Sequence, residues 1–351
     1  MKTDVLIPTA VDSVRGTKIR AGIVGAGLMG RWHAQALEME GGEVVGIADF
    51  DLTKAETLSG KYPNARTFSG VEEMLADGQI DVLHICSPIE SHAEIAERAI
   101  SSGVHLLVEK PLAETNAATL KLYEMAREKN TLLCPIHQFA FQRGVEKAKD
   151  QLPRIGQLIH IETRICSAGA AGLGPEHLDA IAFDILPHPL SLLQRILGTD
   201  ITAAEWDVFQ PIPGELRILS RDKDSTSISI FISMNSRPTE NTFHLLGTHG
   251  VIHIDLFHGY SFMEPGRVSR MAKLTHPFDY AARSFGTAVA NLARRSLRRE
   301  AAYPGLRRLI GEFYRSVKFG LESPVSRAEA LAIAEIRDLL IARAGIAERT
   351  R

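Results

Sequence analysis

Residues 19–30 read IRAGIVGAGLMG, an apolar segment that runs directly into a glycine-rich turn. Gly25, Gly27 and Gly30 have the spacing of a dinucleotide-binding turn that follows a strand and opens a helix. The first glycine permits a tight turn, the second lets the backbone approach a pyrophosphate, and the third lets helix and strand pack closely. Asp49 follows about 20 residues later, where an acidic side chain accepts hydrogen bonds from adenosine ribose hydroxyls.

This turn and the residues after the second strand also indicate which dinucleotide is bound. The helix that begins here directs its N-terminal N–H groups at a phosphate. Asp49 would repel a 2′-phosphate, and the next residues are Phe50 and Asp51 instead of Arg or Lys. NAD is therefore favoured over NADP; a mere tight turn with a helix-capping Asp49 fits the full pattern less well. The expected pyrophosphate site consists of Gly25, Ala26, Gly27, Leu28, Met29 and Gly30.

Short apolar strands alternate with helices up to about residue 140. Ser91 and Glu94 form a capping-box pattern that opens one of these helices. Such alternation predicts βαβ units and a parallel, doubly covered sheet, here an α/β Rossmann domain. The later strands of this sheet are expected at residues 44–48, 82–86, 104–108 and 132–133.

Apolar and polar residues alternate after residue 140, at residues 158–162, 227–232 and 251–255. Strands with one wet face form mostly antiparallel sheets, so we expect an α+β domain with a large open antiparallel sheet. Helices near 183–197, 281–299 and 326–346 are expected to cover its other face. The predicted organisation is an N-terminal arm at 1–18, a dinucleotide-binding domain at 19–140, and a substrate-binding and oligomerisation domain at 141–351.

Composition excludes several function classes. The 351 residues include 40 basic and 42 acidic side chains, without the basic excess of a nucleic-acid binder. No stretch approaches the ~20 apolar residues of a membrane span. The three cysteines form no C-x-x-C pair, which predicts neither a disulfide framework nor a zinc site. We expect a cytoplasmic protein with no metal and with neither nucleic acid nor membrane as a partner.

Several short motifs follow one another along both predicted domains. They are Ser87-Pro88 through His92, Glu109-Lys110-Pro111-Leu112, Phe183-Asp184-Ile185-Leu186-Pro187-His188 before a Leu-rich helix, and Leu246-Gly247-Thr248-His249-Gly250. In this order, the motifs resemble those of the glucose-fructose oxidoreductase / inositol dehydrogenase / MocA (Gfo/Idh/MocA) family over nearly the whole chain after residue 18. The resemblance implies an NAD(P)-dependent oxidoreductase that acts on CH–OH groups.

The resemblance also implies roles for single residues. Lys110 is expected between nicotinamide and substrate, where it would stabilise alkoxide charge. Asp184 and His188, four residues apart and expected on one helix face, would point into the substrate pocket. His188 would transfer the proton, and Asp184 would keep the local charge balanced. Further cofactor contacts are expected from Ser87, Pro88, His92 and Glu109, with His92 near the nicotinamide ribose.

Three departures from the family pattern leave the substrate open. Ser191 stands where many members have an acid, and Ala140 where an Arg often precedes an aromatic residue. Pro187 and Pro189 flank His188, and a proline inside a helix normally kinks it. We expect a sugar, polyol or nucleotide-sugar derivative as the substrate. The alternatives are a reductase of an imine or a tetrapyrrole, and a non-catalytic dinucleotide-sensing regulator.

Plainer explanations exist for the same residues. Lys110 would be a surface lysine before a turn, although the C-terminal end of a parallel strand is where such sheets bind ligands. Asp184 would be a helix cap and His188 a packing histidine. The arginines between Arg294 and Arg308 form a solvated helix face or meet a neighbouring subunit; a phosphate-bearing substrate is the sharper alternative. An uncovered apolar sheet face predicts a homodimer or homotetramer.

Overall fold

The computed structural model describes residues 18–167, 169, 172–198, 201–222, 225–266, 269–300 and 302–345. Residues 1–17 of the expected N-terminal arm lie outside the described residues. Contacts divide the chain into two units. The first runs to Ile136 and regains Arg307–Ser326 later in the chain; the second contains His137–Leu306 and Arg327 onward.

The first unit contains a six-stranded parallel sheet with strand order β3-β2-β1-β4-β5-β6. This order confirms the predicted Rossmann fold, in which a ligand crevice opens where the strand order reverses, here beside β1 and β4. The strands are β1 Ile19–Val24, β2 Gly42–Ala48, β3 Arg66–Phe68, β4 Val82–Ile85, β5 His105–Val108 and β6 Leu133–Pro135.

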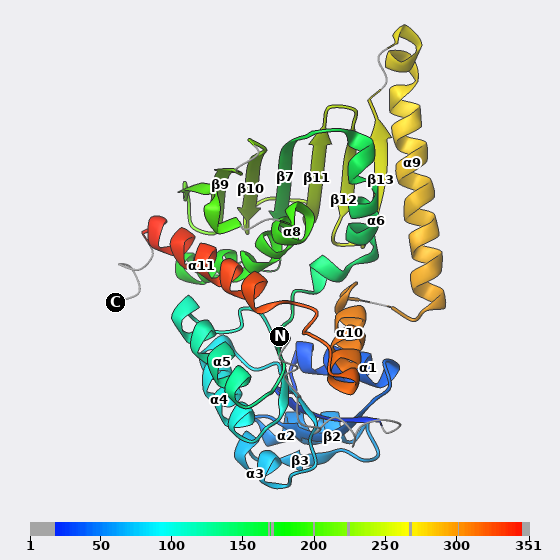
Figure 1. The fold of residues 1–351 in the computed structure, drawn as a ribbon. Helices are drawn as coiled ribbons and strands as arrows, with labels where there is room; N and C mark the ends of the chain where they lie inside the picture. Colours follow the sequence, from blue (N-terminus) through cyan, green and yellow to red (C-terminus); the bar gives the residue numbers. More distant parts are fainter. Residues whose placement is uncertain are drawn as a thin grey trace, which may run out of the picture. The chain divides into compact units, whose positions relative to one another are not determined.

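Six helices accompany this sheet (Figure 1). Thr115 begins α5 by accepting a hydrogen bond from the N–H of Ala118. The expected capping box at α4 is wrong, because the Ser91 hydroxyl donates to the carbonyl of Pro88 instead of capping the helix. The helices are α1 Leu28–Met39, α2 Leu52–Ser59, α3 Val71–Ala76, α4 His92–Ser101, α5 Asn116–Glu128 and α10 Leu306–Phe319.

Helix α10 reaches the first unit from late in the chain. A Cβ on Gly42, at the start of β2, would lie only 2.6 Å from the ring of Tyr314 on α10. Arg307 also forms an ion pair with Glu40, which follows α1. The helix therefore packs closely against the start of the Rossmann sheet.

The second unit contains a seven-stranded sheet with strand order β13-β12-β11-β7-β10-β9-β8. Among the strands that the structure describes here, only β7 and β10 are parallel neighbours, so the sheet is mostly antiparallel, as predicted. Its strands are β7 Leu158–Cys166, β8 Glu205–Phe209, β9 Glu215–Arg221, β10 Ser227–Ser233, β11 Glu240–Gly247, β12 Gly250–Asp255 and β13 Tyr260–Pro265.

The helices of the second unit differ in how they meet this sheet. Within the described part, α8 and α11 contribute side chains to the apolar core, whereas α9 contributes none. The expectation that a helix near 281–299 covers the sheet face is therefore wrong: α9 packs beside the edge strand β13 (Figure 1). The helices are α6 Arg143–Gln151, α7 Pro175–Ile185, α8 Pro187–Leu197, α9 Arg270–Leu297 and α11 Arg327–Arg343.

Short 3₁₀ helices complete the two units, at Ile89–Ser91, Gln138–Phe141, Leu152–Ile155 and Ile201–Ala203. Among the helices that the structure describes, none has both the length and the apolar character needed to cross a membrane.

Candidate active site

The glycine turn between β1 and α1 is shaped by two close backbone approaches. Gly25 has φ +96°, and a Cβ on it would lie 2.6 Å from the carbonyl carbon of Cys86. A Cβ on Gly30 would lie 1.9 Å from the carbonyl oxygen of Gly25. Both positions therefore require glycine, the first for its positive φ as well as for space.

Gly27 is a glycine for a different reason. A Cβ there would meet nothing within 4 Å, so the fold itself does not exclude a side chain. Gly27 is the N-cap of α1 and offers no side chain to the helix, whose first N–H groups have no partner within the helix. Open space before a helix N-terminus fits the pyrophosphate of a dinucleotide.

A cleft of about 690 Å³ lies at the carboxyl ends of β1, β2 and β4. It is lined by five residues expected to bind the cofactor, namely Gly25, Gly27, Asp49, Ser87 and Pro88. The sequence therefore predicted the turn, the acid after β2 and the loop after β4 as parts of one crevice.

Asp49 is fixed by two backbone hydrogen bonds. Its Oδ2 accepts from the N–H of Ala26 at 2.6 Å, and its Oδ1 accepts from the N–H of Asp51 at 2.8 Å. A carboxylate has about four lone-pair positions, so acceptor capacity remains for ribose hydroxyls. Lys54 also lines the cleft and pairs with Asp51 at 3.6 Å. Two carboxylates and one lysine give this part of the cleft a net negative charge, which favours a ribose without a 2′-phosphate.

His92 occupies a different place from the one expected. Its side chain is buried, its Nδ1 faces the carbonyl oxygen of Pro111 at 2.9 Å, and its Nε2 faces that of Ser87 at 2.8 Å. Both ring nitrogens are thus used between two loops, and His92 is not among the residues that line the cleft. We assign His92 to positioning Ser87 and the Lys110-Pro111 segment.

Glu109 is also buried behind the residue that it precedes. Its Oε2 accepts from the N–H of Lys110 at 3.2 Å, and its Oε1 lies 3.1 Å from Nε2 of His33. Glu109 therefore anchors the backbone of Lys110 at the carboxyl end of β5. Lys110 itself is half-buried.

A buried hydrogen-bonded chain extends from Glu109 through His33. Nδ1 of His33 lies 2.9 Å from Nδ1 of His84, whose Nε2 lies 2.8 Å from the hydroxyl of Tyr314. Burial, and then the neighbouring His33, hold the pKa of His84 well below its usual value. Burial raises the pKa of Tyr314 well above its usual value. The sequence did not reveal this chain, because its members come from α1, β4, the residue after β5 and α10.

The Asp184–His188 pair does not lie on one helix, and that expectation is wrong. Helix α7 ends at Ile185 and α8 begins at Pro187, with Leu186 between them. Pro187 has no N–H to continue α7, and its fixed φ suits the first position of a new helix. Asp184 therefore belongs to the last turn of α7, and His188 to the first turn of α8.

His188 is held by packing on its own unit. Its side chain is buried, and its ring lies 4.3 Å from that of Phe139, centroid to centroid. Ser191, which replaces the acid of many family members, is fully buried and donates to the carbonyl of His188 at 2.8 Å. Ser191 thus reinforces the first turn of α8.

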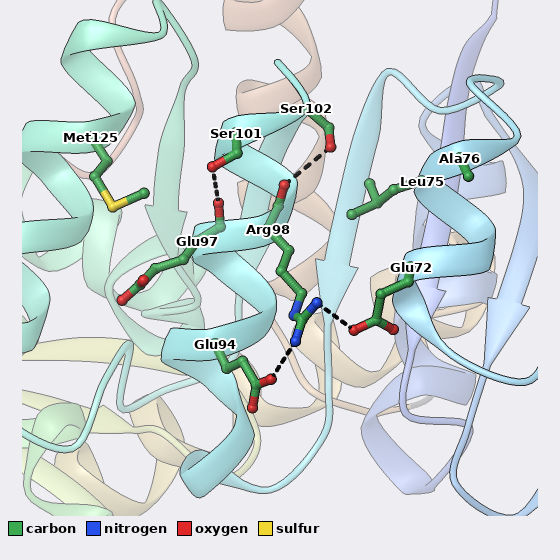
Figure 2. A pocket seen from close by; sticks show the side chains of 9 residues that line it. All are labelled: Glu72, Leu75, Ala76, Glu94, Glu97, Arg98, Ser101, Ser102 and Met125. Atoms are coloured by element: carbon green, nitrogen blue, oxygen red, sulfur yellow. Dashed lines mark hydrogen bonds and ion pairs between the residues drawn. The ribbon is translucent and has the colours of Figure 1, made fainter.

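A second hollow lies on the first unit, between α3 and α4 (Figure 2). Its central cation, Arg98, pairs with Glu72 at 2.8 Å and with Glu94 at 2.7 Å. It is lined by none of the expected site residues, and its charges are matched from within, so we do not assign it to catalysis. In the described ranges, no cluster of three or more His, Cys, Asp or Glu is arranged to hold a metal ion.

Comparisons with known proteins agree with the geometry of the cleft. Residues 19–137 match the model of the oxidoreductase family with an NAD-binding Rossmann fold, Gfo/Idh/MocA. UDP-N-acetylglucosamine 3-dehydrogenase of Acidithiobacillus ferrooxidans is 31% identical over 52% of this chain and 55% of that protein. Inositol 2-dehydrogenase of Salmonella paratyphi B is 27% identical over 58% of this chain and 61% of that protein.

The chain thus matches little more than half of either relative's length. The fold extends further: a solved structure of UDP-N-acetylglucosamine 3-dehydrogenase from Acidithiobacillus ferrooxidans has a TM-score of 0.72 at 16% identity, covering 94% of this chain and 98% of that one. Residues 19–137 are thus similar in sequence to the NAD-binding Rossmann domain of the Gfo/Idh/MocA oxidoreductases.

Proposed function

We propose that this protein is an NAD-dependent oxidoreductase of a secondary alcohol or ketone in a sugar, polyol or nucleotide-sugar derivative. The observation that carries the proposal is the cleft in which Gly25, Gly27 and Asp49 meet at the carboxyl ends of β1 and β2. The names of the two relatives, an inositol dehydrogenase and a nucleotide-sugar dehydrogenase, support the substrate class.

The nicotinamide, when bound, accepts or returns the hydride, and the protein supplies position and proton transfer. The backbone N–H groups at the start of α1 hold the pyrophosphate, and Asp49 accepts from the ribose hydroxyls. The Asp49 carboxylate opposes a 2′-phosphate, which favours NAD over NADP.

Lys110 and His188 have different roles at the reacting oxygen: Lys110 stabilises charge and His188 transfers the proton. Lys110, whose backbone is anchored by Glu109, donates a hydrogen bond to this oxygen and stabilises negative charge that develops on it. His188, whose ring is braced by Phe139, takes the hydroxyl proton in oxidation and returns it in reduction. Asp184 balances the local charge. We further propose a cytoplasmic location and a homodimer or homotetramer formed through the open sheet face.

The test is a panel of polyols, sugars and nucleotide sugars, followed by NADH absorbance with the wild type, Lys110→Ala and His188→Ala. Loss of a general base costs about 10²–10⁴-fold in rate, and loss of an oxyanion donor about 10²–10³-fold. NADH affinity should stay within a few-fold of the wild type, because the pyrophosphate and ribose contacts lie elsewhere. His188→Ala with normal turnover across pH would make His188 a packing residue. If no substrate on the panel reacts while NADH binds, the proposed substrate class is wrong.

A further inference from the structure

A small hollow in the second unit is lined by three basic side chains. Arg143 and Lys147 come from α6, and Arg294 comes from α9. Both helices pack against β13, so the hollow lies among three elements of the same unit (Figure 1). Its volume is about 250 Å³, which is below the ~300–1,000 Å³ of most pockets for drug-sized ligands. The hollow therefore suits a small ligand.

The three cations lack acidic partners in the described part of the chain. Among the described residues, the lining contains neither Asp nor Glu, and no carboxylate forms an ion pair with any of the three cations. Acids on the neighbouring elements are used elsewhere. Glu146 of α6 pairs with Arg195 at 3.2 Å, and Asp255 at the end of β12 pairs with His258 at 2.7 Å. The hollow therefore holds unbalanced positive charge.

The three charges lie close enough to repel one another. Burial, and then repulsion from Arg143 and Arg294, lowers the pKa of Lys147. Burial, and then repulsion from Arg143 and Arg298, lowers the pKa of Arg294, and a weaker attraction by Glu300 opposes this shift. Like charges that converge without a counter-charge are destabilising, and an anion between them would reverse the sign of the interaction.

Other lining groups hold the cations in place and add hydrogen-bond donors. Nζ of Lys147 donates to the carbonyl of Ser261 on β13 at 3.2 Å, and the Ser261 hydroxyl donates to the carbonyl of Gly144 at 2.8 Å. A Cβ on Gly144 would lie 2.8 Å from the carbonyl carbon of Tyr260, so glycine lets α6 approach β13 closely. Thr287 of α9 adds a hydroxyl. An ammonium has three N–H groups, so two of those on Lys147 remain for a ligand.

We propose that this hollow binds a phosphate group. Two guanidinium groups and one ammonium supply the charge-assisted hydrogen bonds that phosphate oxygens accept, and the arginine fork fits a phosphate with two parallel bonds. The start of α6 lies at the same place, and the partial positive charge of a helix N-terminus adds to the attraction. The phosphate-bearing ligand considered for the arginines after residue 293 is thus assigned to Arg294, together with Arg143 and Lys147.

This phosphate site is separate from the dinucleotide cleft. The described linings of the two have no residue in common. Free inorganic phosphate and the phosphate of a small organic molecule present the same group to the three cations. The experiment therefore uses both.

The test is calorimetric titration of inorganic phosphate into the full chain saturated with NADH, at constant ionic strength. The bound dinucleotide occupies the glycine turn, so the added phosphate cannot bind there. We expect one saturable site. Arg143→Gln, Lys147→Gln and Arg294→Gln should each weaken it at least about tenfold, because each removes a hydrogen bond between charged groups. NADH affinity should stay within a few-fold of the wild type and reports intact folding.

Lys149→Gln is the matched control. Lys149 follows Lys147 by two residues on α6 and is not among the described lining residues. The variant removes the same charge from the same helix, and it should bind phosphate like the wild type because salt screens the attraction of a distant exposed charge.

Glucose 6-phosphate and glucose, titrated in parallel, distinguish the two sources of the phosphate group. Tighter binding of glucose 6-phosphate than of inorganic phosphate, without binding of glucose, supports an organic phosphate as the ligand. Equal or weaker binding of glucose 6-phosphate supports the ion itself. Either result supports the site, provided that the three lining variants weaken the binding.

Three results would overturn the proposal. The NADH-saturated wild type binds phosphate with a Kd weaker than about 10 mM, or the three lining variants bind it like the wild type. The third is that Lys149→Gln weakens binding as much as Lys147→Gln, which would make the cations a solvated basic surface. None of these results depends on turnover. A protein that fails to bind NADH would contradict the oxidoreductase proposal instead, and the same variants titrated without NADH would still test the phosphate site.

Discussion

The same substitution three residues apart in the glycine turn should have opposite consequences. In Gly30→Ala the new methyl would lie 1.9 Å from the carbonyl oxygen of Gly25. In Gly27→Ala it would meet no protein atom within 4 Å. We therefore expect Gly30→Ala to damage the fold, and Gly27→Ala to damage only the binding of the dinucleotide.

The magnitudes follow from these contacts. An ordinary contact begins near 3.4 Å, so Gly30→Ala must move two backbone segments apart by about 1.5 Å. Overpacking lowers the free energy of unfolding by about 1–3 kcal/mol. Because a backbone oxygen cannot rotate away, we expect a loss of about 3 kcal/mol and a fall in Tm of roughly 6–12 °C. Gly27 already has φ −70°, which alanine can adopt. Alanine should therefore raise the free energy of unfolding by about 0.4–1 kcal/mol, because it lowers the entropy of the unfolded chain. It should lower this free energy by a similar amount, because it is a poorer N-cap.

The assay measures Tm without ligand and NADH affinity by calorimetry on the same preparations. Gly27→Ala should keep its Tm within about 2 °C of the wild type. Its methyl displaces at least one charge-assisted hydrogen bond to phosphate, worth about 1.5–3 kcal/mol, so NADH affinity should fall about 10–100-fold. Unchanged NADH affinity in Gly27→Ala would refute pyrophosphate binding at this turn. Unchanged Tm in Gly30→Ala would refute the close-packing argument.

Three further predictions concern cofactor choice, pH and assembly. Asp49→Ser should narrow the preference for NADH over NADPH, measured by titration of both; an unchanged ratio would show that Asp49 does not select the cofactor. The pKa of His84 is lowered in the fold, so below about pH 6.5 the unfolded chain binds a proton that the folded one does not, and the free energy of unfolding should fall. Chemical denaturation across this range should show that the free energy of unfolding falls less steeply with falling pH in His84→Gln than in the wild type. Part of the fall should remain, because the pKa of His105 and of His244 is also lowered. A monomeric mass by light scattering at micromolar concentration would contradict the proposed oligomer.

The Rossmann fold could be predicted because its signals are local. Strand residues 19–24, the glycine turn and Asp49 lie within one βαβ unit, and each follows from backbone geometry over a few residues. The alternating pattern of the later strands likewise predicted the mostly antiparallel sheet. Local periodicity therefore sufficed for both sheets.

The remaining errors concern contacts made over long distances or at helix ends. Pro187 was expected to kink one helix, whereas it begins a new one, because the first position tolerates the missing N–H. His92 and Glu109 carry motif-like signals but point their polar atoms at distant carbonyls and at His33. The sequence predicted a helix near 281–299 that covers the sheet face, but could not show that α9 packs beside the edge strand β13.

The late return of α10 has a consequence for synthesis of the chain. The parallel sheet is complete at β6, yet Tyr314, which bonds His84 and packs against Gly42, is translated only much later. From Ile136 to Ser326 translation adds 190 residues, which takes about 10–40 s at 5–20 residues per second. During this interval the nascent Rossmann sheet lacks the Tyr314 hydroxyl that bonds His84. The place of the Tyr314 ring beside β2 is also unfilled. A fragment cut at Ile136 would remain in that state permanently, so the cofactor domain can be excised intact only by grafting residues 307–326 back onto it.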